Sequence, residues 1–317
     1  MTSLRSLCWF AHSVLMFFIG MGVCSSPSAQ NADAVLAIHS KLRDSLTTNH
    51  FQAPLSLDST QTPDSLKGDV YAQIDHPFTE LKSALMVSEG WCELLMLHLN
   101  VKSCSAKGKQ PHEVLSLVIG RKTERQLSDG YKLDFNFATH TTSDDYLRVE
   151  MFSSLGPFNT RDYHLVLEAV ALGSNTSFIH FSYKYSYGLM ARMAMQSYLL
   201  TLGRDKIGFS IIGKKADGSP TFIAGVRGAI ERNAMRYYLA IQSYLDSLAT
   251  TPDARLEKRL NDWFSSTEIY AAQLHELARG EYLSIKRREF QHLRTLSPPK
   301  DSNGQRKHTT PSTNDPK

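Results

Sequence analysis

The sequence predicts an α+β fold in which an antiparallel meander of strands packs on a long helix. Most apolar residues between positions 114 and 226 alternate with polar ones, and turn-forming residues separate the alternating segments, as in consecutive antiparallel strands. A helical apolar stripe follows over residues 228–248 and must pack on another apolar surface. One more strand and a pair of short helices precede the meander, between residues 68 and 99.

The chain begins with the features of a secretory signal peptide. Arg5 precedes an uncharged apolar run over residues 7–23, and small residues suited to signal peptidase follow over 25–30. A membrane-spanning helix needs about 20 apolar residues, slightly more than this run offers. We therefore expect residues 1–29 to be a cleaved signal peptide and the mature protein to be periplasmic or secreted. A lipoprotein modified at Cys24 and an uncleaved anchor are the alternatives, although the residues before Cys24 form a poor lipobox.

The rest of the chain is long enough for one large core with an appendage. We expect the main domain over residues 32–250, a helical extension over 251–296 and a disordered tail over 297–317, where no apolar side chain is present. The formal charge of +4 is small, and basic residues are interleaved with acidic ones along 255–262. The charge pattern therefore predicts no binding to nucleic acid.

Before the meander, apolar residues recur at helical spacing over 32–46, which predicts an entry helix. Residues 52–65 are rich in Ser, Thr, Asp and Pro and are expected to form a loop, and an alternating strand follows over 68–75. Thr79 is expected to cap the next helix, and residues 91–99 form a second short one.

The meander is expected to continue through seven strands. They are predicted at 114–120, 131–138, 146–153, 162–171, 177–187, 206–213 and 220–226. A helical pattern over 188–203 forms an inserted helix.

The helical extension carries one apolar stripe and many cations. We expect it to bend near Ser265, Ser266 and Gly280. Its largest apolar side chains are expected to dock on the outside of the main domain: Trp263, Phe264, Tyr270 and Leu274. The basic stretch from Lys286 to Arg288 is then expected to face a membrane surface or an acidic partner, and the alternative is a merely solvated face.

Two cysteines follow the signal segment, Cys92 and Cys104. In an oxidising compartment an even pair predicts a disulfide. The alternative is a metal site that also uses His98 and His112, but these spacings match no zinc signature, in which paired ligands lie two to four residues apart. The sequence therefore favours the disulfide and predicts no metal site.

The order of these elements resembles the START-like helix-grip superfamily, which includes lipid-transfer START domains and polyketide cyclases. The local resemblance is carried by residues 70–78, with the sequence VYAQIDHPF, and then by Leu81, Leu85 and Trp91. It covers roughly residues 66–250. The resemblance implies a strongly curved sheet that grips the closing helix, with an apolar cavity between them. The inserted helix and the helical extension depart from the family pattern.

Aromatic residues are suitably placed to line such a cavity. In the strand 177–187 the residues Phe181, Tyr183 and Tyr185 share one face. Tyr131 and Phe135 share one face of another strand. These five residues are the candidate apolar lining, and the alternative is a solid core. Tyrosine hydroxyls on an inward face favour a partly polar pocket, because a buried hydroxyl needs a partner.

Polar residues gather at the first turns of the closing helix. Arg227 and Glu231 are spaced to meet on one helical face. A surface ion pair is the simpler interpretation of this spacing. The functional interpretation is that Arg227 or Arg236 receives the anionic group of a ligand at the cavity mouth, because arginine suits carboxylate and phosphate.

No catalytic motif accompanies these residues. The sequence contains no glycine-flanked serine elbow, no phosphate-binding glycine loop and no paired-histidine metal helix. We therefore predict an exported, non-catalytic protein that binds a lipid-like or other hydrophobic small molecule without a cofactor. One alternative is an envelope interaction protein that acts through residues 253–296, and a third is a cyclase or hydrolase on the same fold.

Overall fold

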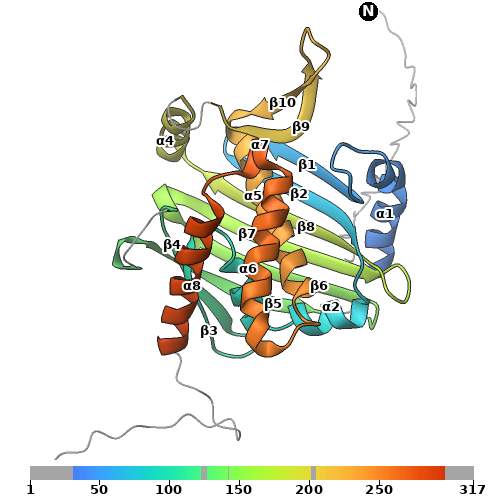
Figure 1. Ribbon diagram of the computed structural model, residues 1–317, viewed down its shortest axis with the longest axis vertical. Helices are drawn as coiled ribbons and strands as arrows, with labels where there is room; N and C mark the ends of the chain where they lie inside the picture. The colour runs from blue at the N-terminus through green and yellow to red at the C-terminus, as the bar shows by residue number, and fades with distance from the viewer. Residues whose placement is uncertain (1–30, 123–126, 142, 201–204, 297–317) are drawn as a thin grey trace, which may run out of the picture. The chain divides into compact units, whose positions relative to one another are not determined.

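The computed structural model describes residues 31–122, 127–141, 143–200 and 205–296 (Figure 1). The predicted signal peptide and tail lie outside these residues. Eight strands form one antiparallel sheet in the order β1-β2-β8-β7-β6-β5-β4-β3. Their bounds are β1 (Leu55–Gln61), β2 (Ser65–Ile74), β3 (Val101–Lys107), β4 (Glu113–Ile119), β5 (Tyr131–His140), β6 (Tyr146–Leu155), β7 (Thr160–Ala171) and β8 (Ser177–Tyr187). Because β3 to β8 are consecutive neighbours, the predicted meander is confirmed for this part of the chain.

The helices pack mainly on one face of this sheet, which we call the inner face (Figure 1). They are α1 (Ala32–Thr47), α2 (Phe78–Leu85), α3 (Ser88–Leu95), α4 (Leu189–Leu200), α5 (Gly225–Asp246), α6 (Pro252–Ile269), α7 (Ala271–Leu274) and α8 (Arg279–Leu296). Two short 3-10 turns, η1 (Leu127–Asp129) and η2 (Pro157–Asn159), precede β5 and β7. The predicted α+β class, with a sheet gripping a long helix and an added helical extension, is confirmed.

Helix α5 is the gripped helix and packs against β1, β2 and β8. Gly68 of β2 permits this close approach. A Cβ atom at this position would lie 3.1 Å from the Cβ of Ala234 and 3.3 Å from the carbonyl oxygen of Ile230, both on α5. A larger residue at position 68 would therefore push the helix away from the sheet.

The inner face carries the main core. Along β8, the alternate residues from Ile179 to Tyr187 are all buried against this core, as predicted. The opposite, outer face is partly covered by α1, where Val35 and Leu46 pack with Tyr146 and Phe178. Strand β8 is therefore buried on both of its faces near its start, although its sequence alternates like that of a half-exposed strand.

Several predicted boundaries were wrong. Residues 55–61 form the edge strand β1, although the segment 52–65 was predicted to be a loop. Strand β3 was not predicted. The segments 206–213 and 220–226 form a separate hairpin, β9 (Ile207–Lys214) and β10 (Pro220–Ala224), and do not extend the meander. Thr79 lies inside α2, which begins one residue earlier, so it is not the cap.

The extension after α5 packs more deeply than predicted, because it was expected on the outside of the main domain. Trp263, Phe264 and Leu274 are buried and belong to the same core cluster as the inner face of the sheet. The indole Nε1 of Trp263 donates to the carbonyl of Arg236 at 3.1 Å, which joins α6 to α5. The break falls between α6 and α8, over residues 270–278, and not at Ser265 or Ser266. No helix in the described part of the chain is long and apolar enough to span a bilayer.

Cys92 of α3 and Cys104 of β3 are bonded, with their Cα atoms 5.2 Å apart. The predicted pairing is confirmed. The bond joins the second helix of the helical pair to the far edge strand of the sheet.

Candidate functional site

Five aromatic side chains meet between the sheet and α5, and we call them the inner aromatic cluster: Tyr163, Phe181, Tyr183, Tyr185 and Tyr237. Tyr237 of α5 lies 5.4 Å from Tyr183 and 5.9 Å from Phe181, measured between ring centroids. Tyr163 of β7 stacks on Tyr185 at 5.2 Å. The stripe predicted on β8 therefore does face the gripped helix, and neighbouring elements add two tyrosines to it.

The hydroxyls of this cluster are unequally satisfied. Tyr163 shares a hydrogen bond of 2.8 Å with Thr160, and Tyr185 donates to the sulfur of Met195 in α4 at 3.7 Å. No hydrogen bond within the described residues involves the hydroxyl of Tyr183 or Tyr237. Burial raises the pKa of Tyr183 well above its ordinary value, so it stays protonated. The interior therefore holds hydroxyl groups that a bound polar atom could still engage.

The two residues predicted on β5 differ in position. Phe135 is buried and meets Tyr163 edge to face at 6.4 Å. Tyr131 is 46% exposed and packs on Phe158 of η2 at 4.9 Å, so its predicted place inside the cavity was wrong. The reason is that Tyr131 is the first residue of β5, at the rim of the sheet, where no helix covers it. Leu189 and Met193 of α4 are also exposed.

Arg227 and Glu231, which were predicted to pair with each other at the start of α5, bind other partners instead. Glu231 is fully buried and accepts four hydrogen bonds, from the hydroxyls of Ser59 and Ser210 and from the backbone N–H groups of residues 209 and 210, at 2.6 to 2.9 Å. Arg227 donates instead to the carbonyl and hydroxyl of Ser59. The carboxylate of Glu231 thus joins α5 to β1 and β9. It is neither a surface ion-pair partner nor accessible to a ligand.

Arg236 lies in a different environment, within a group of side chains that we call the basic cluster: Arg236, Lys122, Lys206, Lys102 and Lys286. Arg236 donates to Glu276 at 2.9 Å, and Lys206 contacts the same carboxylate at 3.1 Å. Lys122 also pairs with Glu276. Although burial raises the pKa of Glu276, these three cations hold it below its ordinary value.

Lys286 belongs to this cluster, and its predicted exposure was wrong. Its side chain is 0% exposed, and its ammonium donates to the carbonyls of His98 and Val101 and to Glu289, at 2.7 to 2.8 Å. Burial lowers the pKa of Lys286 to about 8, against the opposing effect of Glu289. Arg287 forms an ion pair with Glu257, and Arg288 is exposed. The stretch 286–288 is therefore not a continuous basic surface.

His98 lies beside the basic cluster and was not predicted to be a site residue. Its ring stacks on Tyr237 with 4.9 Å between centroids and an interplanar angle of 23°. Its Nδ1 accepts a hydrogen bond from the N–H of Asn100 at 3.1 Å. His98 thus joins the inner aromatic cluster to the basic cluster.

A second charged group lies on the outer face, and we call it the outer network: Lys67, Asp69, Tyr146, Arg148, Glu150, Glu168 and His180. His180 bridges Asp69 at 2.8 Å and Glu168 at 3.2 Å. Tyr146 donates to Glu168 at 2.8 Å, and Arg148 also contacts Glu168. Among the described residues, no group of His, Cys, Asp or Glu side chains has the arrangement needed to hold a metal ion.

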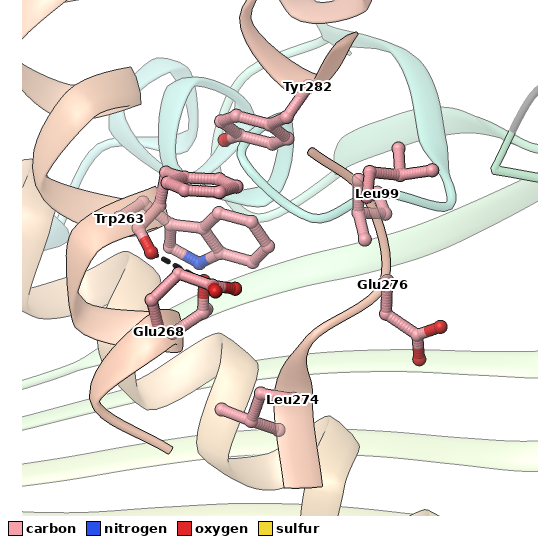
Figure 2. Close-up of a pocket in the computed structure, with 9 residues that line it drawn as sticks. Leu99, Trp263, Glu268, Leu274, Glu276 and Tyr282 are labelled. Atoms are coloured by element: carbon pink, nitrogen blue, oxygen red, sulfur yellow. Dashed lines mark hydrogen bonds between the residues drawn. The ribbon is translucent and has the colours of Figure 1, made fainter. Parts of the chain in front are cut away.

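A small pocket lies between α6 and the segment leading into α8 (Figure 2). Trp263 and Tyr282 stack on one side of it at 5.0 Å, and Leu99, Leu274 and Glu276 lie around it. It has room for about one water molecule. Figure 2 shows the carboxylate of Glu276 extending away from Trp263 and Tyr282. The pocket is therefore too small to be a ligand site itself.

No protein-family model matches the sequence, and no curated protein matches it either. Among solved structures, norcoclaurine synthase from Thalictrum flavum is similar with 12% identity and a TM-score of 0.31, over 44% of this chain and 86% of that one. An aromatase/cyclase from Streptomyces sp. R1128 has 8% identity and a TM-score of 0.31, over 65% and 94%. A conserved protein of unknown function from Enterococcus faecalis has 8% identity and a TM-score of 0.33, over 83% and 98%. At TM-scores this low, the likenesses carry no inference about ligand or activity, and the helix-grip arrangement rests on the strand order and helix packing of this chain.

Proposed function

We propose that the protein binds a hydrophobic, lipid-like small molecule between the sheet and α5, without transforming it. The observation that carries this proposal is the inner aromatic cluster, in which the hydroxyls of Tyr183 and Tyr237 make no hydrogen bond within the described residues. Hydroxyls that make no hydrogen bond to the described residues leave polar contacts open beside an otherwise apolar aromatic surface. An apolar ligand with a few polar atoms would satisfy them.

We also propose that the protein acts outside the cytoplasm. The apolar run over residues 7–23 and the small residues after it support a cleaved signal peptide. The bond between Cys92 and Cys104 supports the same proposal, because disulfides persist in oxidising compartments. Fractionation of the native host tests this part. Processed protein in the cytoplasm with two free thiols would contradict it.

Ligand binding is tested with the neutral dye Nile red and with native mass spectrometry of the purified protein before and after lipid extraction. We expect a co-purifying small molecule and a saturable rise in dye fluorescence. Tyr183→Trp adds volume inside the cluster and should weaken dye binding about 10-fold, because overpacking displaces the ligand.

Tyr71→Trp is the matched control, because Tyr71 stacks on His180 on the outer face. It should leave dye binding unchanged. Thermal melting of both variants verifies that they fold. A protein without co-purifying ligand and without saturable dye binding would overturn the proposed function.

A further inference from the structure

Among the described residues, the basic cluster has more positive than negative charge. Within that part of the chain its five basic side chains have two carboxylates at ion-pair distance, Glu276 and Glu289. Lys102, Lys286 and Arg236 are almost fully buried. Buried charges in folded proteins are normally matched by opposite charges. Within the described residues, the cluster therefore presents an electropositive site that favours an anion.

His98 supplies an independent observation at the same place. Because its Nδ1 accepts the hydrogen bond from Asn100, the proton of the neutral ring is assigned to Nε2. This nitrogen is buried and has no hydrogen-bond partner in the described part of the chain. Asn233 lies near enough to raise the pKa of His98, but the two side chains do not complete a hydrogen bond. The Nε2–H group is therefore a buried donor that lacks an acceptor.

The pKa values of the neighbouring groups shift in the direction expected for a missing anion. Burial lowers the pKa of His98, and the charges of Arg236, Lys286 and Lys122 lower it further. Burial also lowers the pKa of Lys122, and Arg236 and Lys206 add to the effect against the opposing Glu276. A negative charge bound here would offset the repulsion between these cations and raise the pKa values of His98 and Lys122.

The position of the cluster indicates what kind of molecule would carry that charge. His98 stacks on Tyr237, and Tyr237 contacts Phe181 and Tyr183, so cationic and aromatic surfaces adjoin. The side chains of Lys122 and Lys206 are 31% and 28% exposed, which leaves the cationic end in contact with solvent. An amphiphile with one acidic end fits both surfaces.

We propose that the basic cluster binds the anionic group, a carboxylate or a phosphate, of an amphiphilic ligand whose apolar part lies in the inner aromatic cluster. Arg236, Lys122 and Lys206 supply positive charge around the site, and Lys122 and Lys206 lie at its open side. The Nε2–H group of His98 donates to the same anion. Glu276 holds the three cations together. This inference rests on the proposed function, which it makes specific for an acidic ligand.

The test is calorimetric titration of the purified protein with four probes: dodecanoate, dodecyl phosphate, dodecanol and inorganic phosphate. We expect at least one of the two anionic amphiphiles to bind about 10-fold or more tightly than dodecanol, which has the same chain and no charge. The comparison between dodecanoate and dodecyl phosphate identifies the acidic group. Arg236→Gln and Lys206→Gln should each reduce the ratio of the affinity for the anionic probe to the affinity for dodecanol.

Arg148→Gln is the matched control, because Arg148 is a similarly buried arginine on the outer face. It should keep the preference for the anionic probes. Lys206→Gln keeps the test decisive if Arg236→Gln does not fold, because Lys206 is partly exposed. Nitrogen-15 NMR of the histidines adds a direct readout, in which the Nε2 resonance of His98 should shift when the anionic probe binds.

Two further results separate this inference from the proposed function. Equal affinities for dodecanol and both anionic amphiphiles would overturn the anion subsite and leave hydrophobic binding in place. Binding of inorganic phosphate that is lost in Lys206→Gln, without binding of any twelve-carbon probe, would support the anion subsite and refute the hydrophobic ligand.

Discussion

Among the described residues, the outer network has as many carboxylates as bases, whereas the basic cluster has fewer carboxylates than bases. In the outer network, the bases Lys67, Arg148 and His180 contact three carboxylates, those of Asp69, Glu150 and Glu168. In the basic cluster, five bases share two carboxylates. The difference separates two uses of buried charge. A balanced group holds strands together, whereas an unbalanced group is suited to a ligand of the opposite sign.

The largest expected effect concerns Lys286, which has structural partners although it belongs to the unbalanced group. Lys286→Ala leaves two carbonyls and Glu289 without their donor and removes a long buried side chain. We expect a loss of about 3–4 kcal/mol in the free energy of unfolding. Arg288→Ala, at an exposed position two residues later, should change it by less than about 0.5 kcal/mol. Urea unfolding measures both, and equal effects would mean that Lys286 is not buried.

The next effect concerns His180, which bridges two carboxylates of the outer network. His180→Leu leaves Asp69 and Glu168 buried without the cation between them. We expect a destabilisation of about 2–3 kcal/mol, because breaking a buried ion pair from one side leaves an uncompensated charge. Urea unfolding at about pH 5.5 measures it. A variant as stable as the original protein would show that the network is not a balanced, structural one.

His180 also makes the stability of the folded protein depend on pH. Burial lowers the pKa of His180, but its hydrogen bonds to Asp69 and Glu168 raise it above the ordinary 6.5. The stabilisation is therefore fully present below pH 6.5 and is lost as the pH rises through the folded-state pKa. Asp69 and Glu168 have lowered pKa values, so their contribution is lost only in stronger acid, below their ordinary 3.8 and 4.5.

The melting-temperature difference between the original protein and His180→Leu should therefore be larger at about pH 5.5 than at about pH 9. Taking the difference removes the contribution of groups that titrate alike in both proteins. A difference that does not change between these two pH values would show that His180 does not titrate as a bridging cation.

Lys206 is expected to contribute least to the stability of the folded protein. Lys206→Gln removes one of the three cations around Glu276 and leaves Arg236 and Lys122 in contact with it. Because the cluster has excess positive charge, we expect a stability change within about 0.5 kcal/mol, in either direction, by thermal melting. A large loss would place the basic cluster with the outer network as a structural element.

The sequence predicts the meander well because apolar and polar residues alternate along most of its strands, even where both faces of a strand are covered. Strand β8 begins and ends as predicted, at Ser177 and Tyr187. Strand β1 was missed because it lies at the sheet edge, where most of its residues are polar and only two are buried, so its composition is like that of a loop. Strand β3, at the other edge, has the sequence VKSCSAK, whose polar residues also give it a composition like that of a loop.

The basic cluster could not be predicted because its members come from five separate segments, and no local pattern unites them. Lys286 carried one available signal. Tyr282, Lys286 and Phe290 are spaced at four-residue intervals along α8, so the lysine lies on the apolar stripe of its helix. Its neighbours Arg287 and Arg288 concealed that signal by making the stretch look like a basic surface patch. The two carbonyl groups that accept from Lys286 lie 185 and 188 residues earlier in the chain.

The bond between Cys92 and Cys104 gives the basic cluster a dependence on cellular redox conditions. The twelve-residue separation that it closes includes His98 and the carbonyls of His98 and Val101, which hold Lys286. With the bond formed, these groups lie on a short covalent ring that joins a helix to a strand, which limits the range of conformations they sample. With the thiols reduced, the same groups depend on packing alone. Under the proposed function, the oxidised protein should therefore bind an acidic ligand more firmly than the reduced protein does.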